Sequence, residues 1–187
     1  MRYDELRELY EADRRDHARG LTAGTAEYAA MRERDAARRA RARAILAECG
    51  EDGLTPEDLY RAAWLFNHGD TIEEAERGVH LAERAAAGGH GPARWLSAAA
   101  HDRWCMYRGL PQRYGTQIVP DGVGYRVWDT DPAVTDEERA ARDVPPLAEQ
   151  RRRAAEMGRT EPQPPMDHAP DWLRAAVARW AAAGETS

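Results

Sequence analysis

The chain has 187 residues, enough to bury a core, and a formal net charge of −6, which gives no cationic field for nucleic acid or an anionic membrane. All 27 basic residues are arginine, which is typical of a GC-rich genome such as those of actinobacteria. Cys49 and Cys105 are too few for a disulfide framework, and no apolar run approaches the roughly 20 residues of a transmembrane helix. Because the amino-terminal sequence lacks an apolar signal region, we expect a soluble cytoplasmic protein.

Helices dominate the expected secondary structure, since alanine and arginine are abundant and β-branched residues are scarce. Thr55-Pro56 has a capping threonine followed by proline, and Thr71 to Glu74 has the form of a capping box, so both mark helix starts. Glycines mark the ends. The pattern predicts helices over 3–19, 25–49, 56–67, 71–87 and 92–108.

The character of the sequence changes after Gly109. Residues 116–128 alternate around a Gly-rich turn and predict a β-hairpin. Helix is expected again from Thr135 and in a short segment from Pro145. We therefore predict a mainly α fold, an irregular bundle of about six to eight helices with one small β-hairpin. We expect one domain over 1–157, a Pro-rich linker over 158–169 and a last helix over 170–184, which docks on the body or on a partner.

Charged residues interrupt two apolar helix faces. Arg103 lies on the seam formed by Leu96, Ala99, Met106 and Leu110, with Asp102 on its flank. Asp35 and Arg38 interrupt the apolar stripe of the helix over 25–49 in the same way. A guanidinium facing a core is costly unless it is paired, so we expect these polar groups to face one shared pocket, where Asp35 pairs with Arg103 across two packed helices. The alternative is a buried structural salt bridge with no ligand nearby.

His68 lies at the carboxyl end of the third helix, directly before Gly69. Two interpretations stay open: an imidazolium that caps the helix, or a general acid or base influenced by Asp70. His17 and His80 are expected on solvated faces. Since the chain has no His-x-x-x-His or Cys-x-x-Cys pair, we expect neither a metal site nor another cofactor.

The segment from Gln112 to Gln117 combines a phenol, a hydroxyl and two primary amides. Gly115 allows a close backbone approach or a positive φ, and alternation after it would place Tyr114 and Thr116 on one side and Gln117 on the other. Amides that both donate and accept suit a polar ligand. The alternative is a buried turn whose side chains satisfy backbone groups.

Several of these residues form an ordered set of motifs. They are Met31 and Asp35 with Arg38 or Arg39, the helix stop Ala63–Asp70, Asp102-Arg103, and Gly109–Gln117 with its Gln-x-Tyr-Gly-Thr-Gln sequence. Over about residues 2–150 the chain resembles a bacterial family known as a domain of unknown function, which has a His-Ala-Asp-like helix stop in the second position. Asn67 and Gly69 depart from that pattern. The resemblance implies one shared polar site and supplies no reaction.

We expect a small cofactor-independent enzyme that acts on a polar small molecule or modified peptide by acid/base chemistry, such as hydrolysis, cyclisation or elimination, as in a natural-product biosynthetic cluster. The expected catalytic residues are His68, Asp35, Arg103 and Tyr114. The expected substrate-binding residues are Arg38, Asp102, Gln112, Thr116 and Gln117. The alternative is a non-catalytic helical module that binds a protein or small ligand. The sequence does not indicate an oligomeric state.

Overall fold

The computed structural model describes residues 2–184, apart from the side chains of residues 2, 3 and 168. The protein is mostly helical (66%), with eight α-helices and one two-stranded antiparallel hairpin in the described range. This confirms the predicted irregular helical bundle with a small β-hairpin. No helix in that range is long and apolar enough to cross a membrane.

The elements follow the predicted order. The α-helices are α1 (Arg2–His17), α2 (Ala26–Cys49), α3 (Pro56–Asn67), α4 (Ile72–Ala87), α5 (Ala93–Tyr107), α6 (Asp136–Ala140), α7 (Leu147–Thr160) and α8 (Asp171–Ala183). The strands are β1 (Ile118–Pro120) and β2 (Tyr125–Val127), and the 3-10 turns are η1 (Glu51–Gly53) and η2 (Met166–His168). The main difference is α7, which is longer than the short segment expected and continues through Gly158.

Two compact units make up the chain. Unit 1 is Met1–His101 and unit 2 is Asp102–Ser187, so the division falls within α5. The single domain expected over 1–157 stays a prediction. Each unit is described by itself below.

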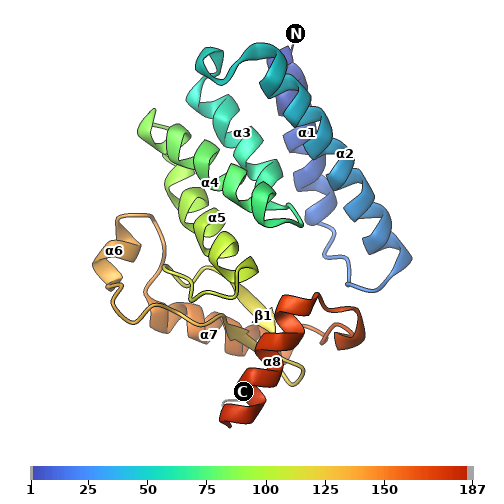
Figure 1. Cartoon of the computed structure of the whole chain (residues 1–187), viewed down its shortest axis with the longest axis vertical. Helices are drawn as coiled ribbons and strands as arrows, with labels where there is room; N and C mark the ends of the chain where they lie inside the picture. Colours follow the sequence, from blue (N-terminus) through green and yellow to red (C-terminus); the bar gives the residue numbers. More distant parts are fainter. Residues whose placement is uncertain (1, 185–187) are drawn as a thin grey trace. The chain divides into compact units, whose positions relative to one another are not determined.

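Unit 1 is formed by helices that bury an alanine- and leucine-rich core. α1 packs on α2 and α3, and α3 packs closely on α4 (Figure 1). Thr25, Thr55 and Thr71 cap α2, α3 and α4, each accepting the N–H of the residue three positions on. Gly78 on α4 faces the end of α3: a Cβ there would lie 3.2 Å from the backbone nitrogen of Asn67. The glycine therefore lets the two helices approach closely.

Unit 2 is built around the hairpin. β1 and β2 are antiparallel, with Val119 opposite Arg126. α7 packs along β2, and Gly158 lies so close to it that an added Cβ would be 3.5 Å from the nitrogen of Tyr125. A glycine inside α7 thus permits close helix–strand packing where the sequence suggested the start of a linker.

The last helix, α8, packs within unit 2. Leu173 and Trp180 join a core cluster with Val119 and Trp128. The rings of Trp128 and Trp180 meet edge to face with centroids 5.4 Å apart, and the Trp180 indole N–H donates to Asp129 at 2.8 Å. The Trp180 ring is therefore packed in the core, and its indole N–H is hydrogen-bonded.

Replacing Trp180 tests this anchoring. We expect Trp180→Ala to lower the free energy of unfolding by about 3–5 kcal/mol, because it leaves a cavity and an unpaired Asp129 oxygen. Trp95, which is 37% exposed, supplies the control, and Trp95→Ala should change stability by less than about 1 kcal/mol. Urea unfolding followed by far-UV circular dichroism measures both. Equal losses would show that Trp180 does not hold α8.

Candidate functional site

Asp35 on α2 is fully buried in unit 1, and three cationic or ring donors surround its carboxylate. Arg32 donates to Oδ2 at 3.0 Å, Arg38 donates to Oδ1 at 2.9 Å, and the ring Nε2 of His17 lies 3.1 Å from Oδ2. Burial alone raises the pKa of Asp35, but the hydrogen bond and charge of His17, together with Arg32, outweigh it and leave the pKa below its ordinary value. Asp35 is therefore held as a carboxylate.

A second buried carboxylate, Asp13 on α1, contacts two side chains near the carboxyl end of α3. Its Oδ2 accepts from the indole N–H of Trp64 at 3.0 Å and lies 2.8 Å from Nδ1 of His68. The imidazoles of His17 and His68 are stacked, with centroids 3.9 Å apart and planes inclined by 24°. Two histidines, each hydrogen-bonded to a buried carboxylate, thus lie face to face.

The backbone around His68 explains how this ring is placed. His68 is the C-cap of α3, as its position before Gly69 indicated. Its carbonyl oxygen accepts from Arg32 at 2.9 Å and from Arg39 at 3.1 Å, and both arginines also pair with Asp70. Orphan carbonyls at a helix end favour such donors. Arginines of α2 therefore fix the end of α3.

One carboxylate and two imidazoles at close range raise the question of a metal ion. The ligand atoms of Asp13, His17 and His68 all lie within 4.8 Å of one another. However, a ring nitrogen binds a metal in the plane of its ring, at about 2.0–2.1 Å for zinc. An ion equidistant from two rings stacked at 3.9 Å would lie far outside both planes. The stacked arrangement therefore favours imidazole–carboxylate hydrogen bonds over one shared ion.

In unit 2, Asp102 organises the segment that follows α5. Its completely buried carboxylate accepts the backbone N–H groups of Arg113 at 2.8 Å, Tyr114 at 2.9 Å and Thr116 at 2.9 Å, and the Thr116 hydroxyl at 2.8 Å. Gly115 between them has a φ of +84°. Asp102 thus holds a tight turn whose backbone requires glycine.

Gln112 supports the same turn through both ends of its amide. Its Oε1 accepts from the N–H of Gln117 at 2.8 Å, and its Nε2 donates to the carbonyls of Gln117 at 3.1 Å and Trp128 at 2.9 Å. The amide of Gln117 donates to Thr116 Oγ1 at 3.2 Å. Tyr114 is buried, and its carbonyl accepts from Arg139 at 3.1 Å. These contacts match the buried-turn alternative, and substrate binding by these residues stays a prediction.

The expected site residues thus fall in two groups. Unit 1 brings Asp35, Arg38 and His68 together, and unit 2 brings together the residues around the Gln112–Gln117 turn. Arg103 belongs to unit 2, and in the described part of the chain its buried Nε has no hydrogen-bond partner. Pairing of Asp35 with Arg103 stays a prediction, although the Asp35 carboxylate already has three donors within unit 1.

Sequence reasoning missed Asp13 and His17. His17 was expected on a solvated face, yet its side chain is only 28% exposed and contacts Asp35. A signal was present: Asp13 follows the buried Leu6 by seven residues on one face of α1, so it is a carboxylate on an apolar seam, as Asp35 is.

Comparison with protein-family models, curated proteins and solved structures found no match. The resemblance to a domain of unknown function stays a prediction, and the interpretation of the cluster rests on its geometry.

Asp35 makes stability depend on pH in a defined direction. Because its pKa is lower in the folded protein than its ordinary 3.8, the ionised group stabilises the fold above that value and loses the effect as the pH falls through the folded-state pKa. The stability difference between wild type and Asp35→Asn should shrink as the pH falls below about 4, by this linkage. Urea unfolding at each pH measures it, and Glu27→Gln on exposed α2 surface should show no such difference. A stability difference that stays unchanged down to pH 2 would contradict the lowered pKa of Asp35.

Asp102 should be a stability residue of unit 2. Asp102→Asn replaces one acceptor oxygen by a donor and removes the charge, so we expect a loss of about 2–4 kcal/mol. Thr116→Val keeps the three backbone bonds to Asp102 but removes the hydroxyl that donates to Asp102 and accepts from the Gln117 amide, so it should cost about 1–2 kcal/mol. Amide hydrogen exchange should accelerate at Tyr114 and Thr116 in the first variant. Unchanged exchange there would show that the turn holds without the carboxylate.

Proposed function

We propose that unit 1 carries the acid–base centre of an enzyme that acts on a polar small molecule or modified peptide. One observation carries the proposal: His17 and His68 stack at 3.9 Å, and each is hydrogen-bonded to a buried carboxylate. Asp13 and Asp35 are both 1% exposed, whereas the side chains of His17 and His68 are 28% and 15% exposed. The imidazoles can therefore reach a substrate that the carboxylates cannot.

The carboxylates and the imidazoles have different roles in this proposal. A buried carboxylate fixes the orientation and tautomer of its histidine and stabilises the imidazolium that forms when the ring takes a proton. Asp13 does this for His68, and Asp35 does it for His17. The imidazoles exchange the proton with the substrate, since histidine is the side chain suited to this near neutral pH.

Stacking links the two rings electrostatically. Two positive charges about 4 Å apart repel by about 4 kcal/mol at an effective dielectric constant of 20. This repulsion couples the rings, and in the proposed mechanism one ring accepts a proton from the substrate while the other donates one. Hydrolysis, cyclisation and elimination all need such a pair.

The surroundings favour a polar substrate. Arg32, Arg38, Asp16 and Asp70 border the cluster and are joined by ion pairs. An apolar ligand would desolvate these charges at high cost, whereas a polar ligand can replace their water.

Separate His68→Gln and His17→Gln variants test the proposal. Each should lower kcat by about 100-fold or more, with a smaller change in KM, because general acid–base catalysis typically contributes 10²–10⁴-fold. The double variant should be little worse than either single one, since residues acting as a unit are not additive. Turnover is measured on a panel of esters, amides, lactones and modified peptides.

The control is His80→Gln, a histidine on α4 with its side chain 54% exposed, which should keep wild-type turnover. Near-UV circular dichroism checks that each variant folds. Wild-type turnover in both folded variants would remove the histidine pair from the chemistry. A wild type that turns over nothing in the panel would instead favour the non-catalytic binding module.

A further inference from the structure

A row of aromatic side chains follows the contact between α1 and α3 in unit 1. Tyr10 on α1 meets Tyr60 and Trp64 of α3 edge to face, with ring centroids 5.9 Å and 5.8 Å apart. Trp64 in turn meets the ring of His68 edge to face at 5.5 Å. Each of these side chains is only partly buried. The row therefore runs along one accessible strip and ends at the stacked histidines.

A small pocket lies at the Tyr60 end of this row. The residues that line this Tyr60 pocket are Arg7, Tyr10, Glu11, Glu57, Tyr60, Arg61, His90 and Pro92. The rings of Tyr60 and His90 have centroids 4.6 Å apart and planes inclined by 43°. The volume is about 240 Å³. A cavity of roughly 150 Å³ holds benzene, and drug-sized ligands occupy roughly 300 Å³ or more. The Tyr60 pocket therefore has the size for one aromatic ring.

The charges around the Tyr60 pocket balance. Two arginines and two glutamates line it, and Arg61 is already paired with Glu57 on the same helix. Burial, together with a hydrogen bond with Tyr10, raises the pKa of Tyr60, so the phenol stays protonated near neutral pH. A charged ligand meets no excess of opposite charge among the arginines and glutamates, whereas a neutral ring can pack against the aromatic side chains.

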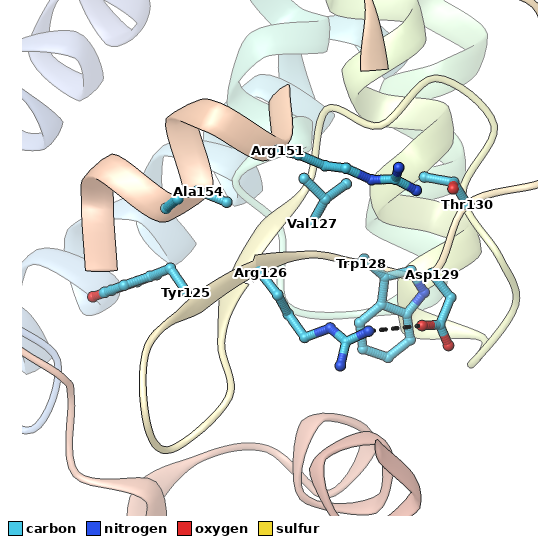
Figure 2. Close-up of a pocket in the computed structure, with 9 residues that line it drawn as sticks. Tyr125, Arg126, Val127, Trp128, Asp129, Thr130, Arg151 and Ala154 are labelled. Atoms are coloured by element: carbon cyan, nitrogen blue, oxygen red, sulfur yellow. Dashed lines mark ion pairs between the residues drawn. The ribbon is translucent and has the colours of Figure 1, made fainter. Parts of the chain in front are cut away.

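The cavity of unit 2 is less suited to a ring. It has a volume of about 490 Å³ and lies beside β2 and α7, where Tyr125 and Trp128 border it (Figure 2). Trp128 is only 1% exposed, so a ligand cannot stack on it, and the Tyr125 hydroxyl donates to the carbonyl of Pro162 at 3.0 Å. The Tyr60 pocket presents three rings instead of one. An aromatic group is therefore expected there.

The distance from the Tyr60 pocket to the histidine pair limits what can occupy both. An α-helix rises about 1.5 Å per residue, so Tyr60 and His68 are separated by about 12 Å along α3. An extended peptide advances about 3.3–3.6 Å per residue, so this distance corresponds to three or four residues. A molecule with a ring in the pocket and its reacting bond at the histidines must be at least that long.

From these observations we propose that the Tyr60 pocket binds an aromatic side chain of a peptide substrate, three or four residues away from the bond on which the histidine pair acts. The ring packs against Tyr10, Tyr60 and His90, and the peptide between the two sites lies over Trp64. This inference rests on the proposed function of unit 1, and it makes the substrate a peptide rather than a small molecule.

Peptide binding can be tested without turnover. A displayed library of random heptapeptides is selected against the full chain, and the enriched peptides should share Phe, Tyr or Trp at one position. Fluorescein-labelled copies of these peptides then give Kd by anisotropy. Failure to enrich any peptide, or enrichment of charged residues without a shared aromatic residue, would overturn the proposal.

Two matched pairs of variants locate the bound ring. Tyr60→Leu and His90→Ala each remove one ring from the pocket and should weaken binding about threefold to tenfold, the range for one aromatic contact. Tyr125→Leu makes the first change in the cavity of unit 2, and His80→Ala makes the second on exposed α4 surface. Both controls should change Kd by less than about twofold, because neither residue lines the Tyr60 pocket. Equal effects within each pair would place the ring elsewhere.

The path of the peptide between the two sites has its own readout. The indole N–H of Trp64 donates to Asp13 at 3.0 Å, and its signal in a nitrogen–proton correlation NMR spectrum is identified by its loss in Trp64→Phe. That signal should shift when peptide binds, whereas the signal of the Trp180 indole, which donates to Asp129, should stay in place. Saturating peptide that leaves the Trp64 signal unmoved would contradict the proposed path.

Turnover separates this inference from the proposed function. Turnover of the enriched peptides that is lost in His68→Gln, with Kd unchanged, supports both. Peptides that bind through Tyr60 but are not turned over by the wild type contradict the acid–base role and leave the aromatic site in place. Turnover of substrates without a ring, at the wild-type rate in Tyr60→Leu, contradicts the aromatic site and leaves the histidine pair.

Discussion

A buried carboxylate must be surrounded by donors, and this requirement organises both units. Removing an ionised group from water costs several kcal/mol unless charges and N–H groups replace the water. In unit 1, two arginines and a histidine are hydrogen-bonded to Asp35, and an indole and a second histidine are hydrogen-bonded to Asp13. In unit 2, Asp102 recruits backbone amides instead. The type of donor decides what each carboxylate can do: amides make a rigid turn, whereas the histidines provide the proton-transfer pair that we propose.

The fold was predictable because its signals are local. Capping threonines at 25, 55, 71 and 135 all start helices, and the β-hairpin lies within the stretch predicted for it. The exception is α7, where Gly158 suggested a helix end. Its packing against Tyr125 is a tertiary contact that outweighs the weak helix propensity of glycine, and a single sequence gives no sign of it.

The candidate site was predictable only in part, because its geometry is not local. Asp35 and His68 were identified by a charge on an apolar seam and a histidine at a helix end. Asp13 and His17 reach them from α1, and neither belongs to a motif of fixed spacing. Gln112 and Asp102 were identified as polar and unusual, but only their partners show that they satisfy backbone groups. Residue type thus indicated where polar groups gather, whereas their roles depend on what they contact.

Gly78 has a consequence for the histidine pair. It lies on α4, opposite the last residues of α3, where an added methyl group would press on the backbone of Asn67, immediately before His68. The ring of His68 stacks on His17 with centroids 3.9 Å apart. A single hydrogen atom in place of a methyl group, on a helix that supplies neither histidine, therefore lets the end of α3 that carries His68 lie close against α4.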